Sequence, residues 1–493
     1  MVKTTTTFLL AALSATVAQA HLEPIGKMRH LVERQAPAST ASTATARAAT
    51  RTHAASASAT SAPAVTGRVA SSPLASLSKI GTATTAEATQ PLPSTFAAGA
   101  TPPVANAPKL PSIANLSPAN YPALDRIPPI DSPEVQQWIK DVDLSQVPNI
   151  PRTQLGACSN SSNSQAVTDA AKNGWWTCGA HTRASDITFC PNKNDWGASF
   201  DDGPSPYTPR LLNLLEAQDI STTFFIVGSR AISRPEMVQA EYMLGHQLSV
   251  HSWAHSSLTT LSNEEIIAEL GWTKKIIHDI TGVTPNTMRP PYGDIDDRVR
   301  YISLKLGLRP IIWTTHNGAT FDTRDWQIGG GVVSATDAYM NFDRFLDQAV
   351  SQLNTGFIVL AHDLYQQSVD LAVDYILPKV INAGQLKMQT IADCLGEGLS
   401  NAYIETADNS THNPIQTTST VVGASGTGFV PNLGATQSSS GSSGSKTSRT
   451  SGSQQSQGAG GSSGTNSSSK VQVIGSGGIM LASTLALMSY LLA

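Results

Sequence analysis

Charged residues are scarce in this sequence of 493 residues. Asp, Glu, Lys and Arg make up 14% of the chain, whereas a soluble globular domain usually contains about 25%. The deficit is concentrated in residues 36–108, which are mainly Ala, Ser, Thr and Pro, and in residues 405–470, which are mainly Ser, Gly and Thr. Length alone would suggest roughly three domains, but the residues outside these segments suffice for one large domain. An excess of basic residues is also lacking, and the formal net charge of −4 excludes a nucleic-acid-binding protein that depends on neutralising phosphates.

Cysteine is rare as well. The sequence has four cysteines and no C-x-x-C pair, which excludes a zinc ribbon. In an oxidising compartment an even number indicates two disulfides, for which four cysteines allow three connectivities. The residues are Cys158, Cys178, Cys190 and Cys394.

Long apolar runs are missing from the middle of the chain, so a multi-pass membrane protein is excluded. A shorter run near the N-terminus follows Lys3 and ends before the small-x-small sequence Ala18-Gln19-Ala20. This pattern predicts that residues 1–20 are a secretory signal peptide.

A second apolar run, Ile479 to Ala493, closes the sequence. A polar spacer and the small residues Asn466, Ser467 and Ser468 precede it, a layout typical of a GPI-anchor signal. We therefore expect attachment at Asn466, removal of residues 467–493, and a mature protein held at the outer leaflet by lipid. The alternative is a tail-anchored or single-pass protein, although no basic cluster follows the run.

The Ser/Thr/Pro-rich segments cannot bury enough apolar surface to offset chain entropy. Residues 21–108 are therefore expected to be a disordered low-complexity segment, and residues 401–466 a glycosylated stalk. Residues 109–185 are expected to form an extended arm of a catalytic domain at 186–400. N-x-S/T sequons, which suit an exported glycoprotein, begin at Asn115, Asn160, Asn409 and Asn466.

Strand-like and helix-like patterns alternate from Asp186 to about Leu399. Strands are predicted at 221–228, 247–251, 308–314 and 356–360. Helices are predicted at 209–218 with Thr208 as its cap, at 262–277 with a Ser262–Glu265 capping box and Gly282 at its end, at 343–353 and at 369–381. Such alternation indicates an α/β fold with a parallel sheet, either open and doubly wound or closed into a β/α barrel.

Four polar clusters each follow a strand-like run. They are Ser199–Pro204 (SFDDGP), His251–His255 (HSWAH), Arg289–Gly293 (RPPYG) and Leu360–Asp363 (LAHD). Because the carboxyl ends of parallel strands meet on one face of such folds, the clusters are expected to converge.

The first two clusters suggest a metal site. The adjacent carboxylates of Asp201 and Asp202 repel each other, and a metal on one would leave the other as a base; the pair alone is also typical of a solvated turn. His251 and His255 are four residues apart and are expected on one face of a helical turn. With Asp202 they would supply three ligands suited to zinc and leave positions open for water and substrate.

The other clusters supply a cation and a candidate acid. Arg289, stiffened by the two prolines that follow it, would keep an aspartate base ionised, or would form a structural ion pair. His362 is the candidate acid of moderate pKa, although a histidine at a strand end is often structural.

These clusters, together with DTRDW from Asp322 to Trp326, resemble the five ordered motifs of the polysaccharide deacetylase domain, carbohydrate esterase family four. The resemblance covers roughly residues 186–400. The terminal signals and the Trp175-Trp176 region are similar to those of fungal GPI-anchored chitin deacetylases. The fold implied is a distorted, incomplete (β/α) barrel of about seven strands. One departure is the longer stretch between Trp313 and Asp322, which is expected to reshape the substrate groove.

The resemblance also implies roles for individual residues. It implies that Asp202, His251 and His255 bind a divalent metal, zinc first and cobalt as a substitute. It implies that Asp201 is the general base.

Further roles follow from the same resemblance. Arg289 would hold the base, and His362 would be the general acid, oriented by Asp325. The backbone N–H of Tyr292 would stabilise an oxyanion, and Trp326 and Leu360 would surround the acetyl methyl group. The resemblance also implies a Cys190–Cys394 disulfide, which leaves Cys158 and Cys178 as the second pair.

The function expected is metal-dependent hydrolysis of N-acetyl groups in chitin, which yields chitosan and acetate. The enzyme is expected to be a monomer on the extracellular face of the cell membrane and in the cell wall. One alternative is a non-catalytic chitin-binding or wall-binding mannoprotein, although here every expected ligand and the base are present. Another alternative is a deacetylase of a different acetylated polymer, such as peptidoglycan or xylan.

Overall fold

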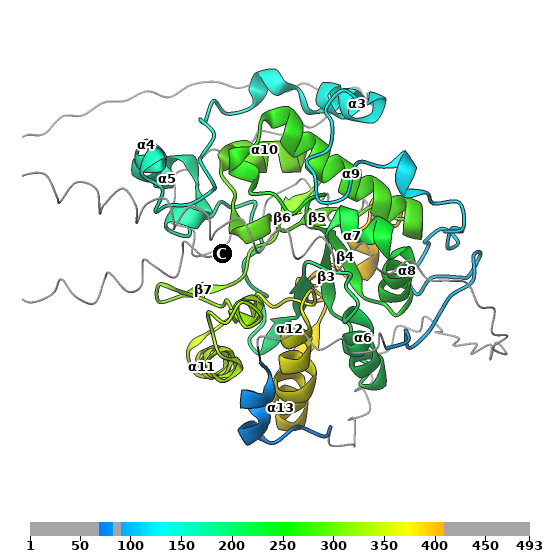
Figure 1. Cartoon of the computed structure of the whole chain (residues 1–493), viewed down its shortest axis with the longest axis vertical. Coiled ribbons are helices and arrows are strands. Elements are labelled where there is room, and N and C mark those ends of the chain that lie inside the picture. Colours follow the sequence, from blue (N-terminus) through cyan, green and yellow to red (C-terminus); the bar gives the residue numbers. More distant parts are fainter. Residues whose placement is uncertain (1–68, 82–89, 409–493) are drawn as a thin grey trace, which may run out of the picture. The chain divides into compact units, whose positions relative to one another are not determined.

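The computed structural model describes residues 69–81 and 90–408 (Figure 1). The predicted signal peptide, most of the stalk, the GPI signal at 467–493 and the sequons at Asn409 and Asn466 lie outside the described residues. Within the described part, no helix combines the length and the apolar character that crossing a membrane requires.

The strands are short and mostly parallel. Five of them form one parallel sheet in the order β2 (Ser199–Asp201), β3 (Thr223–Ile226), β4 (Gln247–Val250), β5 (Thr287–Met288) and β6 (Arg309–Pro310). A second parallel sheet has the order β10 (Lys387–Gln389), β1 (Asp195–Gly197) and β9 (Phe357–Ile358). An antiparallel hairpin pairs β7 (Thr315–His316) with β8 (Ala319–Thr320).

The two parallel sheets join into an interrupted ring. Strands β1 and β2 are one run broken only at Ala198. Beyond β6, the N–H of Thr314 donates to the carbonyl of Ile358 at 3.0 Å, and a parallel bridge between His362 and Asp201 leads from the end of β9 back to β2. Single bonds and bridges, rather than continuous ladders, close this ring. The fold is therefore the expected distorted and incomplete barrel, with β1 and β2 counted as one of seven strands.

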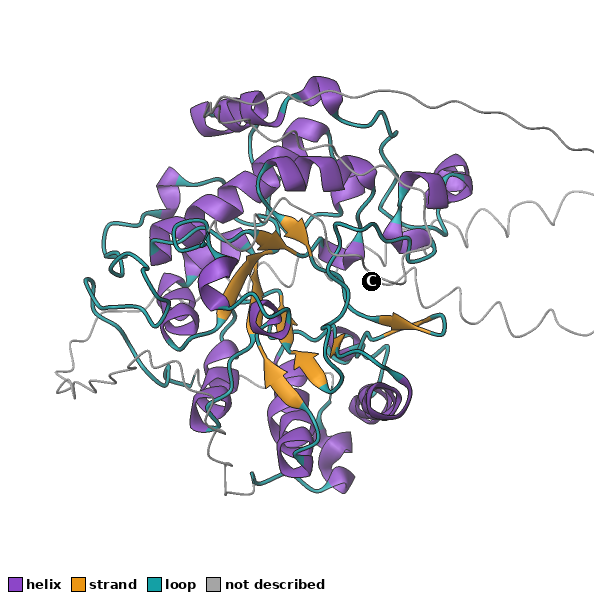
Figure 2. Cartoon of the chain, turned by 180° about the vertical axis from the view of Figure 1, so that it is seen from behind, coloured by secondary structure: helices purple, strands orange, loops and turns teal. Residues whose placement is uncertain are grey.

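Helices lie outside the strands (Figure 2). In chain order they are α3 (Pro133–Val142), α4 (Ser164–Thr168), α5 (Ala170–Asn173), α6 (Thr208–Ala217), α7 (Gly228–Ser233), α8 (Pro235–Met243), α9 (Asn263–Thr281), α10 (Asp297–Lys305), α11 (Ala335–Gln352), α12 (Gln366–Leu371), α13 (Leu377–Ala383) and α14 (Ile391–Cys394). A π-helical turn, Ala372–Ile376, joins α12 to α13, so the helix predicted at 369–381 lies within a longer helical stretch. The helix predicted at 343–353 begins earlier, at Ala335.

Of the predicted helix caps, those of α9 are present and that of α6 is not. Ser262 and Glu265 form the predicted capping box of α9, and Gly282 ends that helix with φ 82°. The prediction that Thr208 caps α6 is wrong. Thr208 is the first helical residue, and its hydroxyl is engaged elsewhere, accepting from the N–H of Ser205 at 2.8 Å and donating to Asp363.

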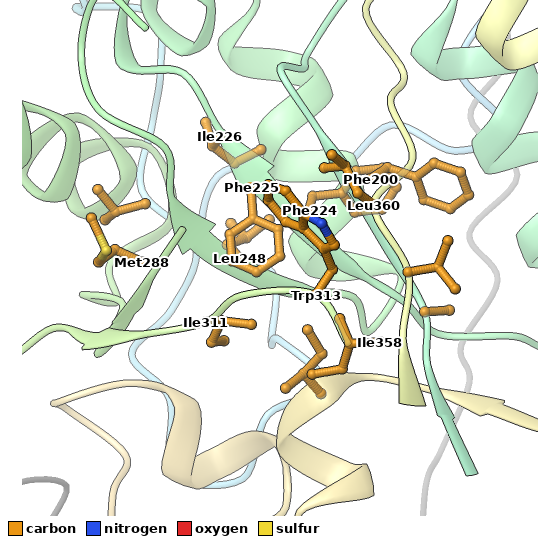
Figure 3. Packing of buried hydrophobic residues seen from close by; sticks show 14 of the residues in the cluster. Phe200, Phe224, Phe225, Ile226, Leu248, Met288, Ile311, Trp313, Ile358 and Leu360 are labelled. Carbon is orange, nitrogen blue, oxygen red and sulfur yellow. The ribbon is translucent and has the colours of Figure 1, made fainter. Parts of the chain in front are cut away.

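The core is made of apolar side chains from successive strands. The register pairs Phe200 with Phe224 and Phe224 with Leu248, so these three residues form one layer (Figure 3). Phe224 and Leu248 are fully buried. Burial of each such side chain contributes about 1.5–3 kcal/mol, which stabilises the barrel despite its short strands.

The N-terminal arm packs against this core. Helix α3 lies along α9, where Gly271 leaves room for the ring of Trp138. Leu77 and Val104, inside the segment expected to be low-complexity, are also buried. Both expected disulfides are confirmed: Cys158 pairs with Cys178, and Cys190 pairs with Cys394 across 204 residues.

Candidate metal centre

Two adjacent aspartates at the end of β2 have different partners. Asp201 is the last residue of the strand, and Asp202 takes a positive φ of 78°. Asp201 contacts Arg289, whereas Asp202 contacts His251 and His255. The sharp bend thus separates two neighbouring carboxylates that would otherwise repel each other.

Three side-chain atoms converge at Asp202. Its Oδ1 lies 3.2 Å from Nε2 of His251 and 2.9 Å from Nε2 of His255. Two ligand atoms that share one tetrahedral zinc ion lie roughly 3.3 Å apart, given bond lengths of about 2.0–2.1 Å. This group is a candidate metal site, and its carboxylate-plus-imidazole chemistry suits a borderline cation.

The surroundings of His251 fix it in the ligand tautomer. Its Nδ1 lies 2.8 Å from the carbonyl oxygen of Arg289, which can only accept. Nδ1 therefore donates, and Nε2 keeps its lone pair toward Asp202. Burial lowers the pKa of His255 despite the opposing charge of Asp202, which favours the neutral imidazole that a metal requires.

Asp202 is held as an anion. Burial raises its pKa, but the two neighbouring histidines outweigh that effect and hold the pKa well below its usual value. The carboxylate therefore offers a charged oxygen at a position where it is only 6% exposed.

The prediction that the two histidines lie on a helical turn is wrong. Ser252 and His255 have positive φ values of 59° and 56°, so the segment is an irregular loop. A buried glutamate of α9, Glu269, holds this loop in place. Its Oε2 accepts from the backbone N–H groups of Trp253 at 2.7 Å and Ala254 at 2.8 Å, which satisfies donors that a helix would have paired internally.

Glu269 is not among the site residues that the sequence motifs predict. The sequence nevertheless contains an indication of its role. Glu269 lies on the apolar face of a predicted helix, between Ile266 and Leu270, and a charge buried there is costly unless it has a partner. Glu269 is fully buried, and Ser256 donates to its second oxygen at 2.8 Å.

Asp201 is fixed by Arg289. Nη1 of Arg289 donates to Oδ1 of Asp201 at 2.6 Å and to the hydroxyl of Ser199 at 3.0 Å. The guanidinium carbon lies 3.9 Å from the ring centre of Phe225, and the whole side chain is buried. Such a desolvated and stacked cation keeps one position, so the carboxylate has little freedom to turn.

His362 forms a second charged pair, with Asp325. Nδ1 of His362 lies 2.7 Å from Oδ1 of Asp325, and the backbone N–H of His362 donates to Oδ2 at 2.9 Å. Burial lowers the pKa of His362, but the charge and hydrogen bond of Asp325 outweigh it and raise the pKa to about 10. His362 is therefore protonated at neutral pH.

Three other predicted site residues lie on neighbouring segments. Tyr292 has a φ of 60° in the turn after Arg289, and no described residue accepts a hydrogen bond from its backbone N–H. Trp326 is half-buried directly after Asp325, and Leu360, 7% exposed, precedes His362 by two positions. The long stretch after Trp313 folds as the β7–β8 hairpin.

The assembled chemistry is that of hydrolysis. One group of ligand atoms can hold a cation, one aspartate held by an arginine can accept a proton, and one protonated histidine can donate a proton. Except for His255, which is half-buried, these groups are buried, which strengthens their electrostatic effect on a bound molecule.

Comparisons with known proteins agree with this chemistry. The sequence model of a family described as "Polysaccharide deacetylase" matches residues 189–311. "Chitin deacetylase 1" of Cryptococcus neoformans var. grubii is 52% identical over 362 residues, which are 73% of this chain and 75% of that protein. "Chitin deacetylase" of Amylomyces rouxii is 32% identical over 284 residues, 56% of this chain and 64% of that protein, so the chain spans less than two thirds of its length. A solved structure, the chitin deacetylase of Colletotrichum lindemuthianum, is 26% identical with a TM-score of 0.40 and covers 46% of this chain and 99% of its own.

Replacement of Glu269 is expected to weaken metal binding. Glu269→Ala leaves the N–H groups of Trp253 and Ala254 without their acceptor, so the loop that carries both histidines loosens. Loss of such an outer-shell partner typically costs about 10–100-fold in metal affinity. Competition with a chromophoric chelator measures the zinc dissociation constant.

The matched control is Glu265→Ala on the same helix, which removes the capping box. It should lower thermal stability yet leave zinc affinity unchanged. Equal zinc affinity in wild type and Glu269→Ala would contradict the assigned role of Glu269.

Proposed function

The chain belongs to the polysaccharide deacetylase family, and we propose that it hydrolyses the N-acetyl groups of N-acetylglucosamine units in chitin to give chitosan and acetate. The observation that carries this proposal is the gathering of Asp202, His251 and His255 beside the Asp201–Arg289 and His362–Asp325 pairs. The names of the curated relatives support chitin as the substrate.

Asp202, His251 and His255 would hold the metal, for which zinc is the best match and cobalt a substitute. When bound, such a cation supplies Lewis-acid polarisation of a carbonyl and a lowered pKa for water. The chain's own part is to keep the carboxylate of Asp202 ionised and the imidazole of His255 neutral at this position.

Asp201 acts as the general base. It takes a proton from the attacking water while Arg289 keeps its carboxylate oriented through the 2.6 Å contact.

Tyr292 and His362 serve the later part of the reaction. The free backbone N–H of Tyr292 donates to the oxygen on which negative charge develops as water adds to the amide carbon. His362 then gives its proton to the departing amide nitrogen, so that the C–N bond breaks to leave an amine and acetate. Trp326 and Leu360 flank the acetyl methyl group.

Asp201→Asn is expected to lower the rate of acetate release from chitin oligomers by about 10²–10⁴-fold, since the proton acceptor is lost. Zinc content should stay at the wild-type level, because Asp201 is outside the ligand group. Acetate release and metal content are measured on the same preparations.

Chelation of the wild type, followed by addition of zinc, provides the control. Activity that survives complete metal removal would contradict the proposed mechanism. Acetate release from acetylxylan but not from chitin would show that another polymer is the substrate. No acetate release from any polymer would favour a non-catalytic binding protein.

Asp325→Asn is expected to shift the alkaline limb of the pH–rate profile to lower pH. His362 must be protonated to act as the acid, so activity falls as pH rises through its pKa, which is about 10 in the wild type. The negative charge of Asp325 is the largest of the causes that raise this pKa, so its removal lowers the pKa of His362. Profiles of kcat/KM against pH test the shift, with Asp337→Asn on α11 as the control; coincident profiles would exclude Asp325 as the orienting residue.

The location proposed is the extracellular face of the cell membrane and the cell wall, through a GPI lipid attached at Asn466, with Asn115, Asn160 and Asn409 as further glycosylation sites. The terminal sequence patterns and the fungal relatives support this location. We propose that the protein is a monomer. A phosphatidylinositol-specific phospholipase should release the protein from intact cells, and retention after treatment would favour a spanning tail.

A further inference from the structure

The residue after the RPPYG segment, Asp294, is a fully buried carboxylate with four donors. Trp175 Nε1 and Thr177 Oγ1 donate to Oδ1 at 2.9 and 3.1 Å. The backbone N–H and hydroxyl of Thr259 donate to Oδ2 at 3.0 and 2.7 Å. One side chain therefore joins the N-terminal arm, the segment that follows His255, and the turn that carries Tyr292.

That turn needs external support. Tyr292 has φ 60° and ψ 9°, a left-handed conformation that is unfavourable for an aromatic residue. Such a conformation persists only where the surroundings hold it. Asp294 lies two residues away, with both oxygens occupied, and is the nearest fixed point on the C-terminal side of the turn.

The arm supports the same turn by packing. The N–H of Trp176 donates to the carbonyl of Ile295 at 2.9 Å. The Trp176 indole lies so close to Gly293 that a Cβ there would clash with it. The same indole packs edge-on against Trp313, with ring centres 4.6 Å apart, and Trp313 lies 6.0 Å from the guanidinium carbon of Arg289.

The arm segment is itself fixed at both ends. The Cys158–Cys178 disulfide closes it, and Thr153 is bonded to Thr259 through a backbone contact of 3.1 Å and a hydroxyl contact of 2.6 Å. All of these arm residues precede residue 189, where the match to the family begins. The arm thus reaches the site from outside the region that the family model matches.

We infer that the arm segment 153–178 completes the catalytic site, and that Trp175 and Asp294 are positioning residues that hold the backbone N–H of Tyr292 toward the reacting oxygen. This inference rests on the proposed function. An N–H that interacts with charge formed in the transition state contributes to kcat more than to substrate binding. A loosened turn therefore lowers kcat more than it changes KM.

The test uses Trp175→Phe in the full chain, which keeps an aromatic ring and removes the Nε1 donor. We expect kcat on chitin oligomers to fall roughly tenfold, in keeping with the cost of small displacements in catalytic geometry. KM should stay within about twofold of the wild type, because it does not depend on the Tyr292 N–H. In an Asp294→Ala background, Trp175→Phe should cause no further loss, since the acceptor of the Trp175 Nε1 hydrogen bond is already absent.

The matched control is Trp138→Phe, which changes the same residue type on the same arm where it packs against α9. It should leave kcat unchanged. Wild-type kcat in Trp175→Phe, or a raised KM with constant kcat, would overturn the inference.

Hydrogen–deuterium exchange gives a readout that does not depend on activity. Amides in the peptide that spans Arg289 to Ile295 should exchange faster in Trp175→Phe and at the wild-type rate in Trp138→Phe. Unchanged exchange in Trp175→Phe would overturn the inference, whether or not the wild type releases acetate. A wild type that releases no acetate would instead contradict the proposed function.

Discussion

One buried oxygen atom, Oδ1 of Asp202, has imidazole nitrogens of His251 and His255 within 3.2 Å. Convergence of one charged and two neutral donors costs desolvation energy, so the rest of the structure must hold them there. The carbonyl of Arg289 fixes the tautomer of His251, and Glu269 fixes the loop that carries both histidines. A site of this kind binds a cation because the donors are already in place.

Charge is balanced locally around this oxygen. The carboxylate of Asp201 faces Arg289, and the carboxylate of Asp325 faces a protonated His362. Each buried charge therefore has a partner with geometry suited to strong hydrogen bonds. The proposed base and the proposed acid differ in their partners. The carboxylate of Asp201 pairs with the guanidinium of Arg289, and the carboxylate of Asp325 keeps the imidazole of His362 protonated.

Segments outside the barrel strands contact the turns around the candidate site. The arm reaches the turn at Tyr292 through Trp175 and Asp294, and the stretch after Trp313 folds into the β7–β8 hairpin beside the DTRDW segment. The barrel thus supplies the metal ligands and the charged pairs. The N-terminal arm contacts the turn that carries Tyr292, and we propose that it holds this turn in place.

The sequence by itself determined the alternation of strands and helices, the capping box of α9, the residues able to bind a metal, and the segments that bring them to the ends of strands. These features follow from local periodicity and from residue chemistry. Only the tertiary structure decided that the HSWAH segment is an irregular loop, that Thr208 bonds Asp363 rather than capping α6, and that Glu269 and Asp294 each saturate a carboxylate with distant donors. The reason is physical: a buried polar group is satisfied by whatever donor the fold brings near, and those donors lie as far as 155 residues away along the chain, as Thr208 does from Asp363.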